Sequence, residues 1–119
     1  MSGVSVIFPS REIYFSPEVL NVMRMSIDTC PKTLDQWYEL FHPEDHRTTA
    51  QLEHVIYSSH EAFVSIVRRL YCGDGHYRKF RLDAFIQRSN DGRPVKLVGN
   101  EILPLGAWLD AFIQRSNDG

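Results

Sequence analysis

The chain has 119 residues, of which 43% are hydrophobic and 24% are charged, and its formal net charge is −2. This length predicts a single domain whose core needs neither disulfides nor metals. No apolar run reaches the roughly 20 residues of a membrane span, and the first residues lack the pattern of a signal peptide. We therefore expect a cytoplasmic protein without a membrane anchor, in which Cys30 and Cys72 are reduced thiols.

Charge is distributed unevenly along the chain. Residues 1–61 hold nine acids and four bases, whereas residues 68–96 hold eight bases and three acids. The bases, beginning with Arg68, fall in expected strands, where long polar side chains suit a solvent-facing surface and deter edge-to-edge pairing. The stretch lacks the aromatic pattern of an RNA-recognition sheet, so we expect no nucleic-acid partner.

The first part of the chain predicts a hairpin and a short helix. Val4–Phe8 and Glu12–Phe15 are apolar runs separated by a proline-containing turn. Ser16-Pro17-Glu18 then supplies a helix cap, a proline at the first helical position and an acid in the first turn. The helix should reach about Arg24.

Two further helices are expected before residue 60. Thr33 and Gln36 have the spacing of a capping box, and an apolar stripe of helical period follows as far as Phe41. Pro43 then begins a third helix that should extend to Ser59. Its stripe is Leu52, Val55 and Ile56, which places His54 on the opposite side and His60 near the end.

Residues 63–99 predict three antiparallel strands joined by two tight turns. Phe63–Cys72 is rich in side chains that favour strands, His76–Arg88 alternates, and Val95–Gly99 continues the pattern. In the middle strand one face carries Arg78, Phe80, Leu82, Ala84 and Ile86. We therefore predict an α+β fold, in which short helices cover one face of a five-stranded antiparallel sheet.

Several motifs over residues 4–103 resemble the PAS domains of bacterial sensor proteins. They are Ile13–Glu18, Trp37 followed by Leu40–Asp45, and Arg69 followed by Asp74–Arg78. Asp91-Gly92, Pro94-Val95 and Val98-Gly99 complete the series. Two departures are Lys79, where the family usually has tryptophan, and Asn100–Leu103, where it often closes with Asp-Ile-Thr.

The resemblance implies a ligand-binding pocket, but the residues identify no cofactor. In this family haem is often carried by a pocket-facing histidine on the long helix, and His54 should face outward. The Asn-Cys-Arg-Phe motif of flavin photosensors is missing. A small organic ligand remains possible between the sheet and the helices, although the same residues are more often plain core. The candidate lining is Trp37, Leu52, Ile56, Val64, Ile66, Phe80 and Leu82.

No motif indicates catalysis or a metal site. The chain has no nucleophile elbow, phosphate loop or zinc spacing. Glu44 and Asp45 are adjacent carboxylates, but their position indicates a helix start rather than an acid and base pair.

Residues 82–92 recur without change as residues 109–119. Such identity favours a recent duplication or an accident of sequence assembly over a functional repeat. Leu105, Trp108, Leu109, Phe112 and Ile113 fall on one helical stripe, so residues 104–119 are predicted to form a helical tail after a domain of residues 1–103. A frayed tail and a strand that imitates the first copy are the alternatives.

The leading hypothesis is a non-catalytic sensory or protein-interaction module in signal transduction. It would regulate a fused or partner output domain by a shift between two conformations. The outer sheet face and the tail would form a homodimer or output interface, and the alternative is a stand-alone protein that binds a small ligand in the pocket. The candidate interface residues are Tyr71, Tyr77, Phe85, Trp108 and Phe112.

Overall fold

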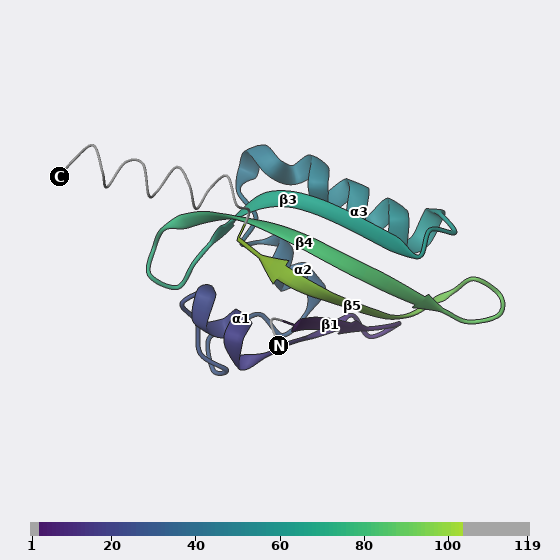
Figure 1. Cartoon of the computed structure of the whole chain (residues 1–119), viewed down its shortest axis with the longest axis horizontal. Helices are drawn as coiled ribbons and strands as arrows, with labels where there is room; N and C mark the ends of the chain where they lie inside the picture. The colour runs from purple at the N-terminus through teal and green to yellow at the C-terminus, as the bar shows by residue number, and fades with distance from the viewer. Residues whose placement is uncertain (1–2, 104–119) are drawn as a thin grey trace.

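Five strands pair into one antiparallel sheet, with the helices packed on one of its faces, in a computed structural model that describes residues 3–103 (Figure 1). The order across the sheet is β2-β1-β5-β4-β3. The predicted α+β fold is confirmed, and the predicted tail of residues 104–119, with Trp108 and Phe112, lies outside the described residues. The strands are β1 (Gly3–Ile7), β2 (Glu12–Phe15), β3 (Phe63–Tyr71), β4 (Tyr77–Arg88) and β5 (Pro94–Ile102).

The helices begin where the sequence predicts their caps. They are α1 (Pro17–Val22), α2 (Leu34–Tyr38) and α3 (His46–Ser58), with a 3₁₀ turn at Pro43–Asp45 before α3. The Ser16 hydroxyl accepts from the backbone N–H of Val19, and the Thr33 hydroxyl accepts from that of Gln36 at 3.1 Å. Each bond satisfies one of the donors that a helix start leaves unpaired.

The helix ends differ from the sequence-based expectation. α1 stops two residues early, because Arg24 adopts a left-handed φ of 57° and its carbonyl lies against Gly73. α2 ends at Tyr38 rather than Phe41, because Phe41 instead forms a β-bridge with Leu70 at the edge of β3. These are tertiary contacts, and no local pattern announces them.

The inner face of the sheet and the helices form one core. Alternation along β4 is confirmed, since Phe80, Leu82 and Ala84 are each 0% exposed while Phe85, on the other face, is 61% exposed. His54 on α3 is exposed, as its helical phase predicted. β5 extends the expected strand to Ile102, and this extension brings Glu101 onto the inner face.

Helix α3 is fastened to the sheet at both ends. At its start, the Asp45 carboxylate accepts from the backbone N–H and the guanidinium of Arg69 on β3, at 2.8 and 2.9 Å. At its end, the Arg88 guanidinium donates to the carbonyls of Val55 and Ile56, at 2.6 and 2.8 Å. Two arginines of the sheet therefore set how the longest helix lies across the core.

Candidate functional site

The seven predicted ligand-binding residues all come together in the core. Their exposure ranges from 0% to 4%, and the helix members pack against the strand members as expected. None of them lines the hollow beside β2 or those at Arg69, His60 and Ser5. Ligand binding by these side chains therefore stays a prediction.

A buried ion pair lies at the centre of this core. The Arg68 guanidinium on β3 reaches across β4 and donates to both carboxylate oxygens of Glu101 on β5, at 2.7 and 2.6 Å. Both side chains have 0% exposure. The rings of Trp37 and Phe41 lie against the guanidinium, with their centroids 4.8 and 4.7 Å from its central carbon. The aromatic faces and the carboxylate together compensate the buried positive charge.

Two hydrogen-bond donors in this region have no acceptor. Within residues 3–103, Trp37 Nε1 and Arg68 Nε are buried side-chain nitrogens without a partner. Burial raises the pKa of Glu101, and the charge and hydrogen bonds of Arg68 act in the opposite direction. A buried donor without an acceptor is costly, so each of these two nitrogens lowers the stability of the core.

The position of Arg68 corrects the interpretation of the basic stretch as solvent-facing. Arg68 has the parity of Ile66 and Leu70 on β3, so the alternation that places those residues inside also places Arg68 inside. Glu101 likewise follows Leu97 and Gly99 at even spacing. The signal was present in both strands, but only the register of β3, β4 and β5 brings the two charges together.

The outer face of the sheet carries the three interface candidates that lie within residues 3–103. Tyr71 is 40%, Tyr77 46% and Phe85 61% exposed, and the two tyrosine rings contact each other edge-on. Val67, which the sequence analysis left out, is 47% exposed on the same face. Alternation from the buried residues would have identified it.

A single cross-strand row runs over this outer face through all the strands. Phe63 pairs with Phe85, Phe85 with Val98, Val98 with Ser5, and Ser5 with Tyr14. The rings of Phe63 and Phe85 are 5.1 Å apart, and Phe63 and Tyr14 are 46% and 56% exposed. We call these five residues the outer row. Within the described residues no helix covers it.

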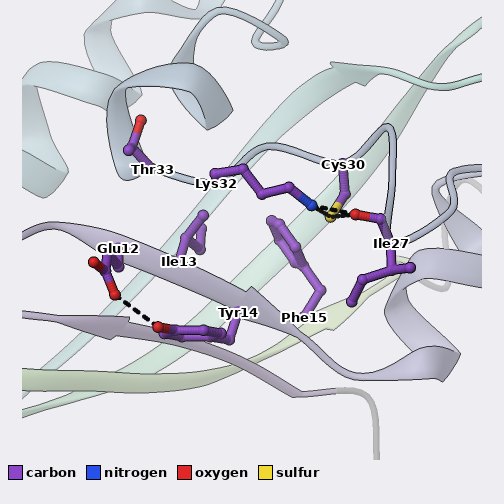
Figure 2. A pocket seen from close by; sticks show the side chains of 8 residues that line it. All are labelled: Glu12, Ile13, Tyr14, Phe15, Ile27, Cys30, Lys32 and Thr33. Atoms are coloured by element: carbon purple, nitrogen blue, oxygen red, sulfur yellow. Dashed lines mark hydrogen bonds between the residues drawn. The ribbon is translucent and has the colours of Figure 1, made fainter.

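A surface hollow of about 410 Å³ lies beside the edge strand β2 (Figure 2). Its walls are largely apolar, and Ile27 at its rim is 68% exposed. The Lys32 ammonium donates to the Ile27 carbonyl and lies 3.4 Å from the Cys30 sulfur, so its donors are directed at the protein itself. The lining residues are Glu12, Ile13, Tyr14, Phe15, Ile27, Cys30, Lys32 and Thr33.

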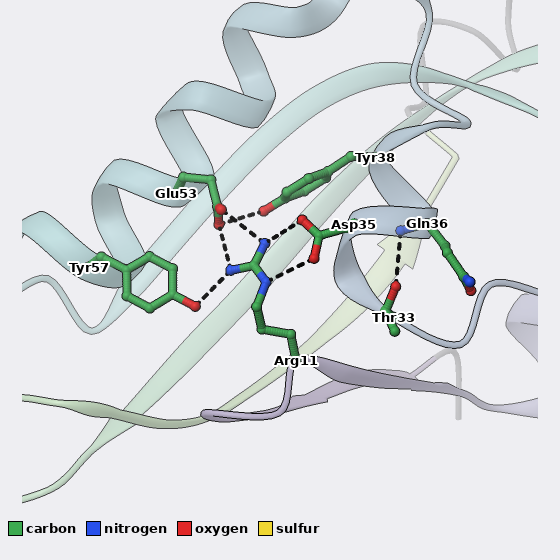
Figure 3. A network of polar contacts seen from close by, with 7 residues as sticks. All are labelled: Arg11, Thr33, Asp35, Gln36, Tyr38, Glu53 and Tyr57. Atoms are coloured by element: carbon green, nitrogen blue, oxygen red, sulfur yellow. Dashed lines mark hydrogen bonds and ion pairs between the residues drawn. The ribbon is translucent and has the colours of Figure 1, made fainter.

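Arg11 ties the first hairpin to two helices (Figure 3). Its guanidinium donates to Asp35 on α2 at 2.9 Å and to Glu53 on α3 at 2.9 Å, and it also binds the Tyr57 hydroxyl. The hydroxyl of Tyr38 donates to Glu53 at 2.9 Å, and burial raises the pKa of Tyr38. The network therefore links α2 and α3 to each other and to the first hairpin.

The described residues offer neither a metal site nor a membrane helix. Among residues 3–103 no three His, Cys, Asp or Glu side chains converge as metal ligands would. Glu44 and Asp45 lie just before α3, and their carboxylates form ion pairs with Arg69 rather than capping the helix. In the same range no helix is long and apolar enough to cross a membrane. Cys30 and Cys72 are both free thiols.

Comparison with known proteins identifies the family. A sequence model of the PAS fold matches residues 12–100, so the chain belongs to the PAS family. The predicted resemblance is therefore confirmed, and with it the assignment to sensory domains typical of signal-transduction proteins. No curated protein matches the chain by sequence.

Solved structures share the fold at low sequence identity. The N-terminal domain of a diguanylate cyclase with a PAS/PAC sensor from Marinobacter aquaeolei is 17% identical, with a TM-score of 0.71, and the match covers 84% of this chain and 91% of that one. A sensory box histidine kinase/response regulator from Burkholderia thailandensis is 18% identical, with a TM-score of 0.74 and coverage of 98% and 86%. Drosophila melanogaster Cycle PAS-B with bound ethylene glycol is 15% identical, with a TM-score of 0.71 and coverage of 87% and 100%.

Proposed function

We propose that this chain is a non-catalytic, cytoplasmic sensory module that regulates a fused or partner output domain through the outer face of its sheet. The outer row carries this proposal. The row spans every strand of residues 3–103 and is apolar except at Ser5, and the helices in that range lie on the opposite face, so the outer face is suited to a protein contact. Two of the structural neighbours, a diguanylate cyclase and a histidine kinase, combine a sensor with an output domain.

The buried ion pair offers a route between core and surface. Arg68 and Glu101 connect β3 to β5 beneath β4, and the outer row crosses the same three strands. A change in what the guanidinium binds would therefore alter how these strands pack. Leu103 directly follows β5, so a change in the packing of β5 would also move Leu103. The mechanism is a shift between two packings that a ligand or partner favours differently.

A homodimer is the simplest partner arrangement for the outer row. A two-fold contact needs a self-complementary patch, and a mainly apolar row flanked by paired charges meets that need. On the flank, Asp83 accepts from Ser65 at 2.6 Å and forms an ion pair with Arg81 at 2.9 Å. These charges are already paired, so covering them costs less than covering isolated ones.

The test is the molar mass of the full chain in solution, measured by light scattering after size-exclusion chromatography. Phe85→Ser should convert a dimer into a monomer. The matched control is Ile27→Ser, which removes another exposed apolar side chain away from the outer face and should leave the dimer intact. A wild-type monomer at all concentrations, or a dimer that survives Phe85→Ser, would contradict the proposed dimer contact.

A stand-alone small-ligand-binding protein is the second candidate, favoured by the two unpaired donors in the core. Trp37 Nε1 and Arg68 Nε together would suit a small ligand with an acceptor oxygen. Native mass spectrometry of freshly purified protein, with an absorption spectrum of the same sample, tests this. Extra mass that is lost on denaturation supports a ligand, and the bare mass of the chain speaks against one.

A further inference from the structure

The slot that β4 fills between β3 and β5 is specified by residues whose sequence occurs twice in the chain. Residues 82–88 form the second half of β4, and residues 109–115 have the same sequence. We propose that residues 109–115 can replace residues 82–88 in this slot of the same chain, with residues 82–93 then displaced from the sheet. The domain would hold two interchangeable copies of one strand.

The inner side of the slot selects a small side chain at one position. Ala84 is 0% exposed and pairs with Val64 on one side and Gly99 on the other. The backbones approach so closely here that a Cβ on Gly99 would lie 2.8 Å from the Cβ of Ala84. Such contacts leave little room for a larger residue. The repeat meets the requirement with Ala111.

The contacts that Asp83 and Phe85 make on the outer side of the slot can be made by the repeat as well. Asp83 accepts from Ser65 at 2.6 Å, and the ring of Phe85 lies 5.1 Å from that of Phe63. Asp110 and Phe112 are the corresponding residues of the second copy.

The anchor at the end of helix α3 is also duplicated. Arg88 donates to the carbonyl oxygens of Val55 and Ile56, which the helix end leaves without intrahelical partners. Arg115 occupies the same place in the second copy. The repeat thus carries both the strand and the side chain that fastens the strand to the helix layer.

The direction and reach of the chain permit the replacement. Residues 82–88 run antiparallel to β5, and a strand that turns back after β5 runs the same way. Residues 102–108 would form the connection that brings Leu109 opposite Glu101, where Leu82 lies now. The displaced residues 82–93 would have to join Arg81 to Pro94, which are roughly 24 Å apart along the sheet at the strand rise. Their fully extended reach is roughly 40 Å.

Loop closure decides which copy occupies the slot. The pairs that residues 82–88 make are the same in both arrangements, and the second loses only the pair of Arg81 with Ile102, so the main difference lies in the connections. The first arrangement closes a short turn at residues 89–93, whereas the second closes two longer connections at a greater entropic cost. The first should therefore predominate, in agreement with β4 as it stands in the structure. A substitution that destabilises only the first copy in the slot would increase the population of the second arrangement.

Three variants of the full chain test the proposal by thermal unfolding. Ala84→Asp places an unpaired carboxylate in the slot, Ala111→Asp makes the same change in the second copy, and the third variant combines both. Ala111→Asp should leave the Tm unchanged. Ala84→Asp should lower the Tm yet keep a cooperative transition, and the double variant should lose that transition. If Ala84→Asp loses as much as the double variant, the proposal is overturned.

Hydrogen exchange on Ala84→Asp provides the direct readout. The amides of residues 109–115 should become at least tenfold more protected than in the wild type, and those of residues 82–92 should lose protection. A folded Ala84→Asp variant in which residues 109–115 still exchange freely overturns the proposal. Protection that appears only at concentrations where light scattering detects a dimer contradicts it too, because the exchange would then occur between chains.

Discussion

The two faces of the sheet bury and expose aromatic side chains in opposite ways. Against the inner face, the Trp37 and Phe41 rings are 0% and 6% exposed and lie over the guanidinium of a buried ion pair. On the outer face, the rings of Phe63 and Phe85 contact each other at a tilt and are 46% and 61% exposed. Side chains of similar chemistry therefore serve stability on one face, whereas on the other they leave an exposed apolar surface, which is the contact surface that we propose.

The largest expected effect is the difference in stability between two matched substitutions, one on each face of the sheet. Phe80→Ala should lower the free energy of unfolding by about 3–5 kcal/mol, because it leaves a cavity in the core. Phe85→Ala should cost less than about 1 kcal/mol in the monomer, because its ring is already in water. Urea denaturation at low protein concentration measures both. Equal losses would mean that the outer face is buried.

The buried ion pair sharpens the same comparison within the inner face. Glu101→Ala should cost about 3–5 kcal/mol, because it leaves the Arg68 guanidinium buried without its counter-ion. The double variant Arg68→Met/Glu101→Leu should recover most of this loss, since an apolar pair of similar volume needs no compensation. Chemical denaturation of the three proteins checks the cycle. If the double variant is no more stable than Glu101→Ala, the ion pair stabilises the fold more than an apolar pair of similar volume does.

Acid should weaken the anchor at the start of α3. Hydrogen bonds from the Arg69 side chain and backbone lower the pKa of Asp45 from 3.8 to about 2. The folded state thus binds fewer protons, so the contribution is complete above about pH 5 and is lost as the pH falls from about 4 to 2. After solvent screening we expect about 1 kcal/mol. The measurement is urea denaturation at pH values from 6 to 2.5. This part of the pH dependence should disappear in the Asp45→Asn variant.

The smallest expected effect tests the outward side of α3. His54→Ala should change the free energy of unfolding by less than about 0.5 kcal/mol, because the side chain is exposed. It should also leave any visible absorbance of the purified protein unchanged. Loss of a coloured cofactor in this variant would contradict the outward orientation.

Local patterns predicted most of the fold. The caps at Ser16 and Thr33, the alternation of β4 and the helical phase of His54 each depend on residues close in sequence. The same patterns predicted that the seven proposed ligand-binding residues lie together in one core. The predicted ends of α1 and α2 were wrong, because a partner far along the chain sets each end. The partners are Gly73 for α1 and Leu70 for α2.

The sequence by itself determined the order of the elements, the inward side of each strand and the PAS resemblance, because hydrophobic period and capping are local properties. Tertiary structure decided which charges meet. Arg68 and Glu101 are 33 residues apart and join only because β4 lies between their strands in a fixed register. The outer row likewise exists only in the assembled sheet, since pairing between strands depends on contacts that no single segment contains.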